Sequence, residues 1–248
     1  MPPDAGAPDA PAPSPAESAP GRFGRLGAFR AFQHRNYRLY FTGQLTSLAG
    51  TWMQSAAQAW LVLKLTNSSM MLGVVSFAQF LPILLVGLFA GVIIDRVDRR
   101  RTIILTQNLL MLSAFTLAIL TWTGKVRVEH VIILASFNGI VGAFDMPSRQ
   151  SFVVEMVGYE DLANAIALNS MMFNGARMIG PAIAGLTIAW LGTATCFFLN
   201  GLSFLAVIWS LILMDVPRRV VTSAGVAMIE QLREGLAYIW KHRPLFYQ

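Results

Sequence analysis

The stretch that decides the fold is GVIIDRVDRRR, residues 91–101, because it places a short charged loop between two long apolar runs. One run covers residues 70–94 and the other covers residues 102–123. Each is close to the roughly 20 residues that a helix needs to cross about 30 Å of hydrocarbon. The pattern therefore predicts two membrane-spanning helices joined by a basic loop.

Four further apolar runs of similar length lie outside this pair. Their expected bounds are residues 39–65, 128–146, 162–191 and 194–214. The composition agrees, since the 248 residues are 55% hydrophobic and only 13% charged, with a mean hydropathy of +0.55. That is about half the charge of an average soluble chain. We therefore predict an all-α membrane protein with six transmembrane helices, and the low charge argues against a cytosolic enzyme.

The net charge of +6 is distributed unevenly along the chain. Lys and Arg concentrate before the first span, in the 95–101 loop and after Met214, whereas the opposite loops hold only Lys64, Lys125 and Arg127. The positive-inside rule then places both ends of the chain in the cytoplasm and the spans in the plasma or inner membrane. The cations do not gather on one solvated face, so we expect no nucleic-acid partner.

The loop motif and three later segments carry a family resemblance. GVIIDRVDRRR is similar to the signature loop of the major facilitator superfamily, although Asp98 stands where that family usually has Gly. The segments DMPSRQSF (145–152), EDLANAIALN (160–169) and NGARMIGPAIAG (174–185) resemble the enterobactin-exporter-like branch of macrolide and multidrug effluxers. The resemblance covers about residues 34–246.

This resemblance implies the N-terminal half of a secondary transporter. The six spans would form two inverted three-helix repeats, with substrate bound near the midplane between two six-helix halves. The expected activity is export of small organic molecules, drugs or siderophore-like compounds by alternating access. The expected partners are the lipid bilayer, a small-molecule substrate and a C-terminal six-helix half of the same full-length chain.

The domain organisation follows from the composition of the two ends. Residues 1–21 are rich in Pro and Ala and are expected to form a disordered cytoplasmic tail. Residues 22–216 would form the transmembrane domain, and residues 217–248 an amphipathic cytoplasmic linker leading toward a seventh helix. We therefore expect this sequence to be a fragment of a longer transporter.

Three groups of residues are candidates for function. The conformational-switch loop comprises Gly91, Asp95, Arg96, Arg99, Arg100, Asp145 and Arg149. The packing and antiporter-like motif of the fifth span comprises Gly180, Pro181 and Gly185, because small residues admit a neighbouring helix and proline bends one. The candidate substrate cavity comprises Gln54, Gln58, Asn138, Asn174 and Arg177, because polar groups within spans avoid lipid.

Alternatives remain for these polar residues and for the whole chain. Each amide is equally consistent with a hydrogen bond between helices, and Arg177 with a buried ion pair. An intramembrane enzyme would need a buried catalytic constellation, whereas His34, His130 and His242 lie at membrane edges. We therefore expect no enzyme, catalytic residue, cofactor or metal. A half-size transporter acting as a homodimer, or a non-transporting six-span partner or remnant, stays open.

The single cysteine, Cys196, permits no disulfide within the chain. No neighbouring residue in the sequence would promote its thiolate form. We expect it to be buried and unreactive.

Overall fold

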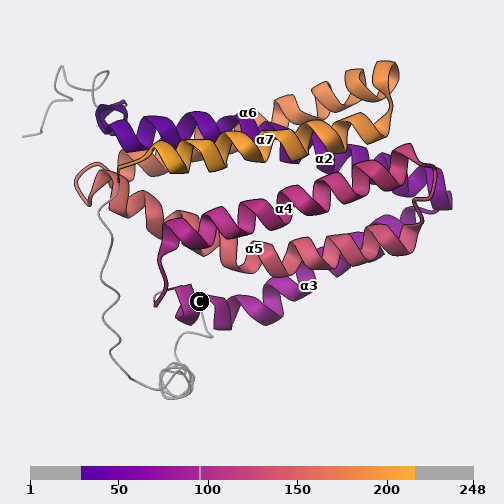
Figure 1. The fold of residues 1–248 in the computed structure, drawn as a ribbon, viewed down its shortest axis with the longest axis horizontal. Helices are drawn as coiled ribbons and strands as arrows, with labels where there is room; N and C mark the ends of the chain where they lie inside the picture. The colour runs from indigo at the N-terminus through magenta and orange to yellow at the C-terminus, as the bar shows by residue number, and fades with distance from the viewer. Residues whose placement is uncertain (1–28, 95, 216–248) are drawn as a thin grey trace, which may run out of the picture.

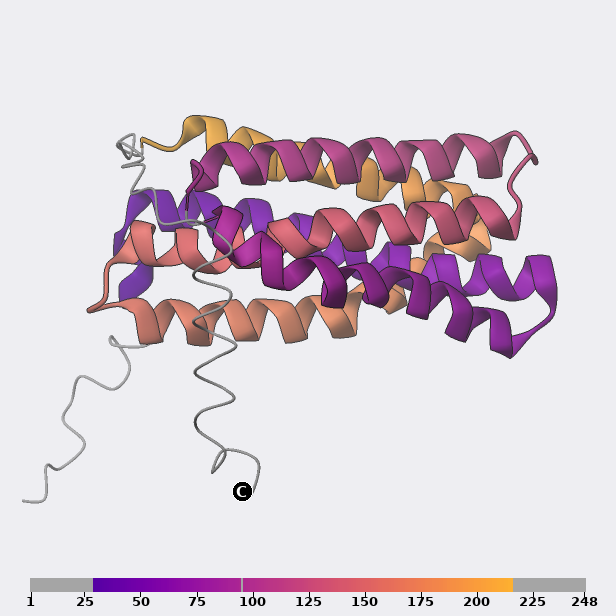
Figure 2. The same cartoon turned by 90° about the horizontal axis from the view of Figure 1, so that it is seen from below.

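The computed structural model describes residues 29–94 and 96–215, which form a bundle of long helices lying side by side (Figures 1 and 2). A 3-10 turn, η1 (Arg30–Gln33), precedes six α-helices. These are α2 (Arg35–Thr66), α3 (Ser69–Ile94), α4 (Arg99–Trp122), α5 (Val128–Val157), α6 (Leu162–Leu191) and α7 (Thr193–Leu213). The expected tail at 1–21 and the whole of the expected linker at 217–248 lie outside the described residues, and so does Asp95.

The six apolar runs correspond to these six helices, with one substantial difference. The fourth span was expected to end at Met146, but the corresponding helix, α5, continues through Pro147 to Val157. Proline removes one backbone donor from the helix and does not always end it. Here the residues beyond it supply Phe152, Val153 and Met156 to a buried cluster, so tertiary packing holds the extra turns in place.

Length and composition identify four of the helices as candidates to cross a membrane. They are α3 over Ser69–Gly87, α4, α5 and α7. Helices α2 and α6 contain 32 and 30 residues and are therefore long enough, but they are not among these four. Helices α2 and α6 pack against each other.

Large apolar side chains cover much of the outer surface of the bundle. Phe77, Leu84, Leu112, Ile133 and Trp209 are each more than 60% exposed. A soluble monomer rarely exposes so much apolar surface. This surface is suited to contact with lipid chains, in agreement with the membrane protein predicted from composition.

The first three long helices and the last three, taken as two groups, make corresponding contacts with each other. Helix α2 packs against α6 and α7, while α5 packs against α3 and α4, and α4 packs against α7. The first helix of each group therefore contacts the second and third helices of the other group. Each helix of the second group also begins about 93 residues after its counterpart in the first.

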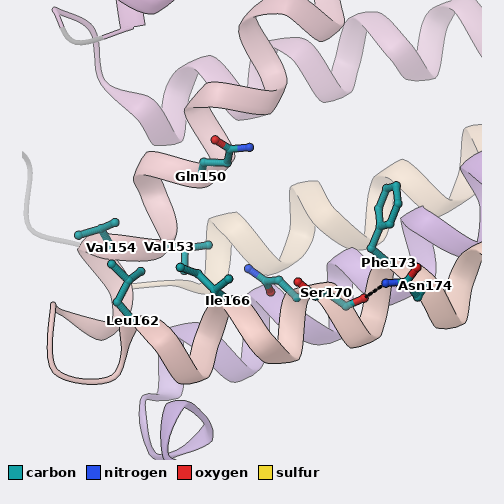
Figure 3. Close-up of a pocket in the computed structure, with 9 residues that line it drawn as sticks. Gln150, Val153, Val154, Leu162, Ile166, Ser170, Phe173 and Asn174 are labelled. Carbon is teal, nitrogen blue, oxygen red and sulfur yellow. Dashed lines mark hydrogen bonds between the residues drawn. The ribbon is translucent and has the colours of Figure 1, made fainter. Parts of the chain in front are cut away.

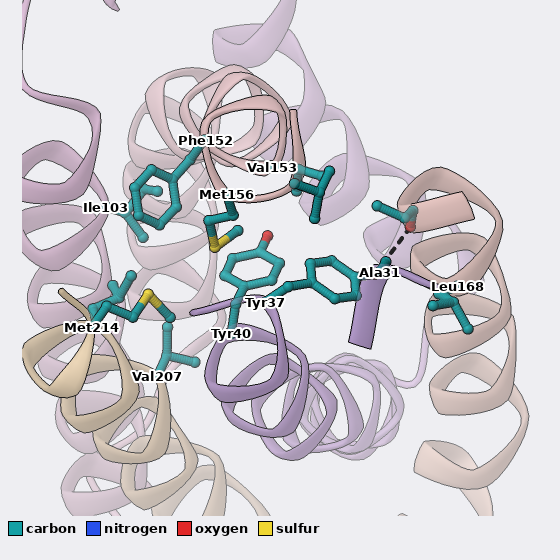
Figure 4. Close-up of a cluster of buried hydrophobic side chains, with 13 residues drawn as sticks. Ala31, Tyr37, Tyr40, Ile103, Phe152, Val153, Met156, Leu168, Val207 and Met214 are labelled. Carbon is teal, nitrogen blue, oxygen red and sulfur yellow. Dashed lines mark hydrogen bonds between the residues drawn. The ribbon is translucent and has the colours of Figure 1, made fainter. Parts of the chain in front are cut away.

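Two large buried clusters fill the interior, and a third, smaller one joins Ala90 and Ile94 of α3 to Ala143 of α5. We call the end of the bundle at which α4 and α6 begin the basic end. One cluster lies there and includes Tyr37, Tyr40, Ile103 and Phe152, as Figure 4 shows. The other is built from residues such as Met53, Leu61, Val131 and Phe197. Together they join all six long helices into one packed body.

Candidate functional site

The polar centre near the basic end is formed around Asp145 of α5. This carboxylate accepts hydrogen bonds from Thr106 Oγ1 at 2.5 Å and Gln107 Nε2 at 3.0 Å, both on α4, and from Arg149 Nε at 2.5 Å. Asp145 is only 8% exposed. A buried charge is costly unless it is paired and hydrogen-bonded, and here three donors meet it. The group therefore ties α4 to α5.

The remaining cations of the predicted switch loop are anchored separately. Arg99 pairs with Glu155 near the end of α5, with Nη1 to Oε1 at 2.5 Å. Arg100 Nη2 donates to the carbonyl of Ile212 on α7 at 3.2 Å. Arg96 is exposed. Arg99 and Arg100 thus link the start of α4 to the ends of both α5 and α7.

Asp98, the departure from the family loop, has a clear local role. It is the N-cap of α4, and its Oδ1 accepts a hydrogen bond from the backbone N of Arg101 at 3.1 Å. Its φ of −67° is accessible to any residue, so no glycine is required here. Aspartate is among the best N-cap residues, and it also complements the positive end of the helix dipole.

The predicted packing motif of α6 works through one of its glycines. A Cβ on Gly180 would lie 2.5 Å from Trp52 Cβ and 2.9 Å from Met53 N, so α6 and α2 cross here almost backbone to backbone. Pro181 lies inside the continuous helix α6. At Gly185, and likewise at Gly91, a Cβ would meet no described atom within 4 Å. Only Gly180 provides the expected close approach.

The crossing at Gly180 brings an aromatic ring to Arg177. The guanidinium carbon lies 5.5 Å from the centre of the Trp52 ring. Phe173, one turn before Arg177, also contacts Trp52, with the centres of the two rings 5.5 Å apart in an edge-on arrangement. Arg177 is exposed, and within the described part of the chain it has no acidic partner. A cation–π contact offsets only part of the cost of a charge in an apolar helix.

A pocket of about 470 Å³ lies between the end of α5 and the first half of α6 (Figure 3). Gln150 lines it from α5, and Ser170 and Asn174 line it from α6. The full lining is Gln150, Val153, Val154, Leu162, Ile166, Asn169, Ser170, Phe173 and Asn174. Of the five predicted cavity residues, only Asn174 lines this pocket.

The other predicted cavity residues lie elsewhere. Gln54 Oε1 accepts a hydrogen bond from Asn200 Nδ2 of α7 at 2.7 Å. This is the hydrogen bond between helices that the sequence allowed as an alternative to substrate contact. Asn138 has a buried Oδ1 without a hydrogen-bond partner among the described residues. Gln58 is partly buried. The described residues therefore do not bring the predicted cavity set together in one pocket.

Sequence reasoning missed several residues that complete these sites. Trp52 and Phe173 look like ordinary apolar members of their spans, and only the helix crossing reveals their contact with each other. Thr106 and Gln107 carried a readable signal, because two adjacent polar residues inside an apolar run require a partner. Among the described residues, no group of three or more His, Cys, Asp or Glu side chains could hold a metal ion.

Comparison with known sequences shows that this chain is similar to transporters. A family model described as transmembrane secretion effector matches residues 26–245. The staphyloferrin A transporter of Staphylococcus aureus (strain NCTC 8325 / PS 47) is 30% identical over 170 residues, which are 65% of this chain and 43% of that protein. The multidrug efflux pump Tap of Mycolicibacterium fortuitum is 30% identical over 207 residues, 79% of this chain and 50% of Tap.

A more distant relative shows the same partial overlap. Macrolide efflux protein A of Streptococcus pyogenes is 23% identical over 220 residues, 86% of this chain and 54% of that protein. The chain thus spans about half the length of the curated relatives that it matches. No solved structure matches it.

Proposed function

Because this chain belongs to the transmembrane secretion effector family of the major facilitator superfamily, we propose that it exports small organic molecules by alternating access. The observation that carries the proposal is the family match over residues 26–245, together with relatives named for transport and efflux. Family and relatives point to membrane transport and away from enzymatic catalysis. Drugs and siderophore-like compounds are the proposed substrate classes.

The proposed architecture is a pair of inverted three-helix repeats, α2–α4 and α5–α7. The reciprocal packing of the two groups and their regular offset support it. The sequence around the first helix of each group supports it as well. Gly50, Trp52, Gln58 and Trp60 of α2 are matched at a constant offset by Gly142, Phe144, Gln150 and Phe152 of α5. In this arrangement all six helices are spans, including α2 and α6.

A second six-helix unit would complete the transporter. Curated relatives about twice as long as the matched region support this part of the proposal. Both ends of this chain would lie in the cytoplasm, since the positive-inside rule applies to the Lys and Arg distribution. The Asp145 group would then brace the cytoplasmic end of the six-helix unit, with Asp95 and the basic loop as the proposed switch beside it.

An efflux assay tests this function. Bacteria that lack their own drug pumps would express either the 248-residue chain or the complete open reading frame of its locus, and would be loaded with fluorescent dyes, a macrolide or a siderophore. We expect lower accumulation of at least one compound with the complete reading frame. Asp145→Asn should reduce efflux while Glu129→Gln, which changes an exposed carboxylate in the first turn of α5, should not.

Two outcomes would redirect the proposal. Unchanged accumulation of every compound class, with the protein present in the membrane, would contradict export and favour a non-transporting membrane partner. Full efflux by the 248-residue chain alone would favour a half-size transporter acting as a homodimer, which a measurement of its mass in nanodiscs would then check.

A further inference from the structure

The pocket between α5 and α6 has an uncharged lining of mixed polarity. Its walls carry three amides and one hydroxyl, from Gln150, Asn169, Asn174 and Ser170, among five apolar side chains. A volume of about 470 Å³ falls in the usual range for sites that hold small organic ligands. The pocket therefore fits an apolar body with a few hydrogen-bonding groups.

Existing hydrogen bonds determine which polar atoms of the pocket can meet a ligand. Asn169 uses its Oδ1 to accept from the hydroxyl of Tyr37 at 3.0 Å, which leaves its Nδ2 as a donor. Asn174 uses its Nδ2 to donate to the carbonyl of Ser170 at 2.8 Å, which leaves its Oδ1 as an acceptor. One donor and one acceptor thus lie about 7.5 Å apart along the axis of α6.

Arg177 continues the same face of α6 beyond the pocket. Ser170, Asn174 and Arg177 are spaced by four and three residues, and residues with this spacing are neighbours on one face of a helix. Helix rise puts Arg177 only about 4.5 Å further along the axis than Asn174. Phe173 connects the two features, because it lines the pocket and also contacts Trp52, the ring beneath Arg177.

A cation within a membrane span is costly without a partner, so Arg177 favours binding of an anion at this position. It lies about 22 Å along α6 from Leu162, as far from the basic end as the middle of a span. The described residues offer it an aromatic face and no carboxylate. Its planar guanidinium carries donors arranged to bind a carboxylate through two hydrogen bonds.

We propose that this pocket and Arg177 form one binding subsite for an amphiphilic organic carboxylate, whose apolar body occupies the pocket while its carboxylate binds the guanidinium. The proposal rests on the proposed transport of small organic molecules and specifies one chemical class among them. Asn169 and Asn174 hydrogen-bond polar groups in the middle of the ligand. Trp52 holds the guanidinium in place from below, and Gly180 makes that contact sterically accessible.

A matched pair of fluorescent probes tests the subsite by binding alone. Dansylglycine carries a carboxylate, and dansylglycinamide has the same body with a neutral amide. The full chain in nanodiscs of zwitterionic lipid should bind dansylglycine about tenfold more tightly, because a hydrogen bond to a charged group contributes about 1.5–3 kcal/mol. Arg177→Gln should abolish this preference and leave the affinity for the amide unchanged, which also shows that the variant is folded.

Further variants separate the two parts of the subsite. Arg177→Lys should keep part of the preference, since lysine retains the charge without the planar fork. Ser170→Phe should weaken binding of both probes by filling the pocket. Arg127→Gln is the matched control, because Arg127 is an exposed cation at the start of α5, and it should behave as wild type.

Three results would overturn the proposal. One is a carboxylate preference that persists in Arg177→Gln. Another is unchanged binding of both probes in Ser170→Phe. The third is loss of the preference in nanodiscs containing phosphatidylglycerol, which would assign Arg177 to a lipid phosphate. If the protein exports compounds but does not prefer dansylglycine over its amide, only the subsite is refuted. If it shows the Arg177-dependent preference but no efflux, only the export function is refuted.

Discussion

Asp145 and Arg177 are both charged side chains within long helices of the bundle, but their surroundings are opposite. Asp145 is buried and receives three hydrogen bonds, including one from a cation on its own helix. Arg177 is exposed on α6 and rests on the Trp52 ring without a described counter-ion. The Asp145 carboxylate is paired within the fold, whereas the Arg177 guanidinium is available to bind a group outside the described residues.

This difference separates two uses of charge in one membrane bundle. A satisfied charge such as Asp145 fixes how two helices are placed, because moving either helix would leave donors or acceptors unpaired. An unsatisfied charge such as Arg177 contributes little to holding helices together and is suited to binding. The comparison therefore predicts that the two residues respond very differently to mutation.

The largest expected effect is the loss of Asp145. Asp145→Ala should destabilise the purified protein by about 3–5 kcal/mol, because it leaves Arg149 without its partner in a buried site. Arg177→Ala should cost only about 0.5–1 kcal/mol, the value of an exposed cation–π contact. Unfolding in mixed detergent micelles, followed by circular dichroism, measures both. Equal losses for the two variants would contradict the comparison, and Glu129→Ala serves as the exposed-carboxylate control.

The next effect concerns the crossing that positions Trp52 under Arg177. Gly180→Ala should destabilise the bundle by about 1–3 kcal/mol, because the added methyl collides with the backbone and Cβ atoms of α2. Gly185→Ala is the matched control, since its Cβ would meet no described atom and alanine favours the helix. Detergent unfolding again gives the difference. A tolerated Gly180→Ala would mean that α2 and α6 do not cross as closely as described.

A smaller effect is expected at the start of α4. Asp98→Ala should cost about 1 kcal/mol, because the backbone N of Arg101 loses its capping acceptor. Asp98→Gly, which restores the residue usual in the family loop, should cost only a few tenths of a kcal/mol. The same unfolding assay compares the two variants, and a glycine variant less stable than the alanine variant would refute the capping role.

The smallest effect is expected for the amide pair between α2 and α7. A double-mutant cycle of Gln54→Leu and Asn200→Leu should give a coupling of about 0.6 kcal/mol, the average for hydrogen bonds between helices in a membrane. Efflux should remain near wild type in both variants if Gln54 is structural. Strong loss of efflux with little coupling would return Gln54 to the substrate pathway.

The helices were predictable from sequence because long apolar runs bounded by charged loops leave few other structures. Even so, α5 ran past its expected end, since the packing of Phe152 and Met156 outweighed the disruption by Pro147. The pairing of Asp145 with Arg149 was also readable, because residues four apart share a helix face. The role of Trp52 was not, because which aromatic residue meets Arg177 depends on how α2 crosses α6.

Cys196 offers a practical advantage for studying this protein. The only cysteine in the sequence is fully buried on α7, where its Sγ lies 4.0 Å from the carbonyl oxygen of Ala184. Maleimide reagents should therefore leave the folded protein unmodified. A single cysteine introduced at an exposed position away from the pocket, such as Lys125 between α4 and α5, could then carry a spin label or fluorophore without removal of the native thiol.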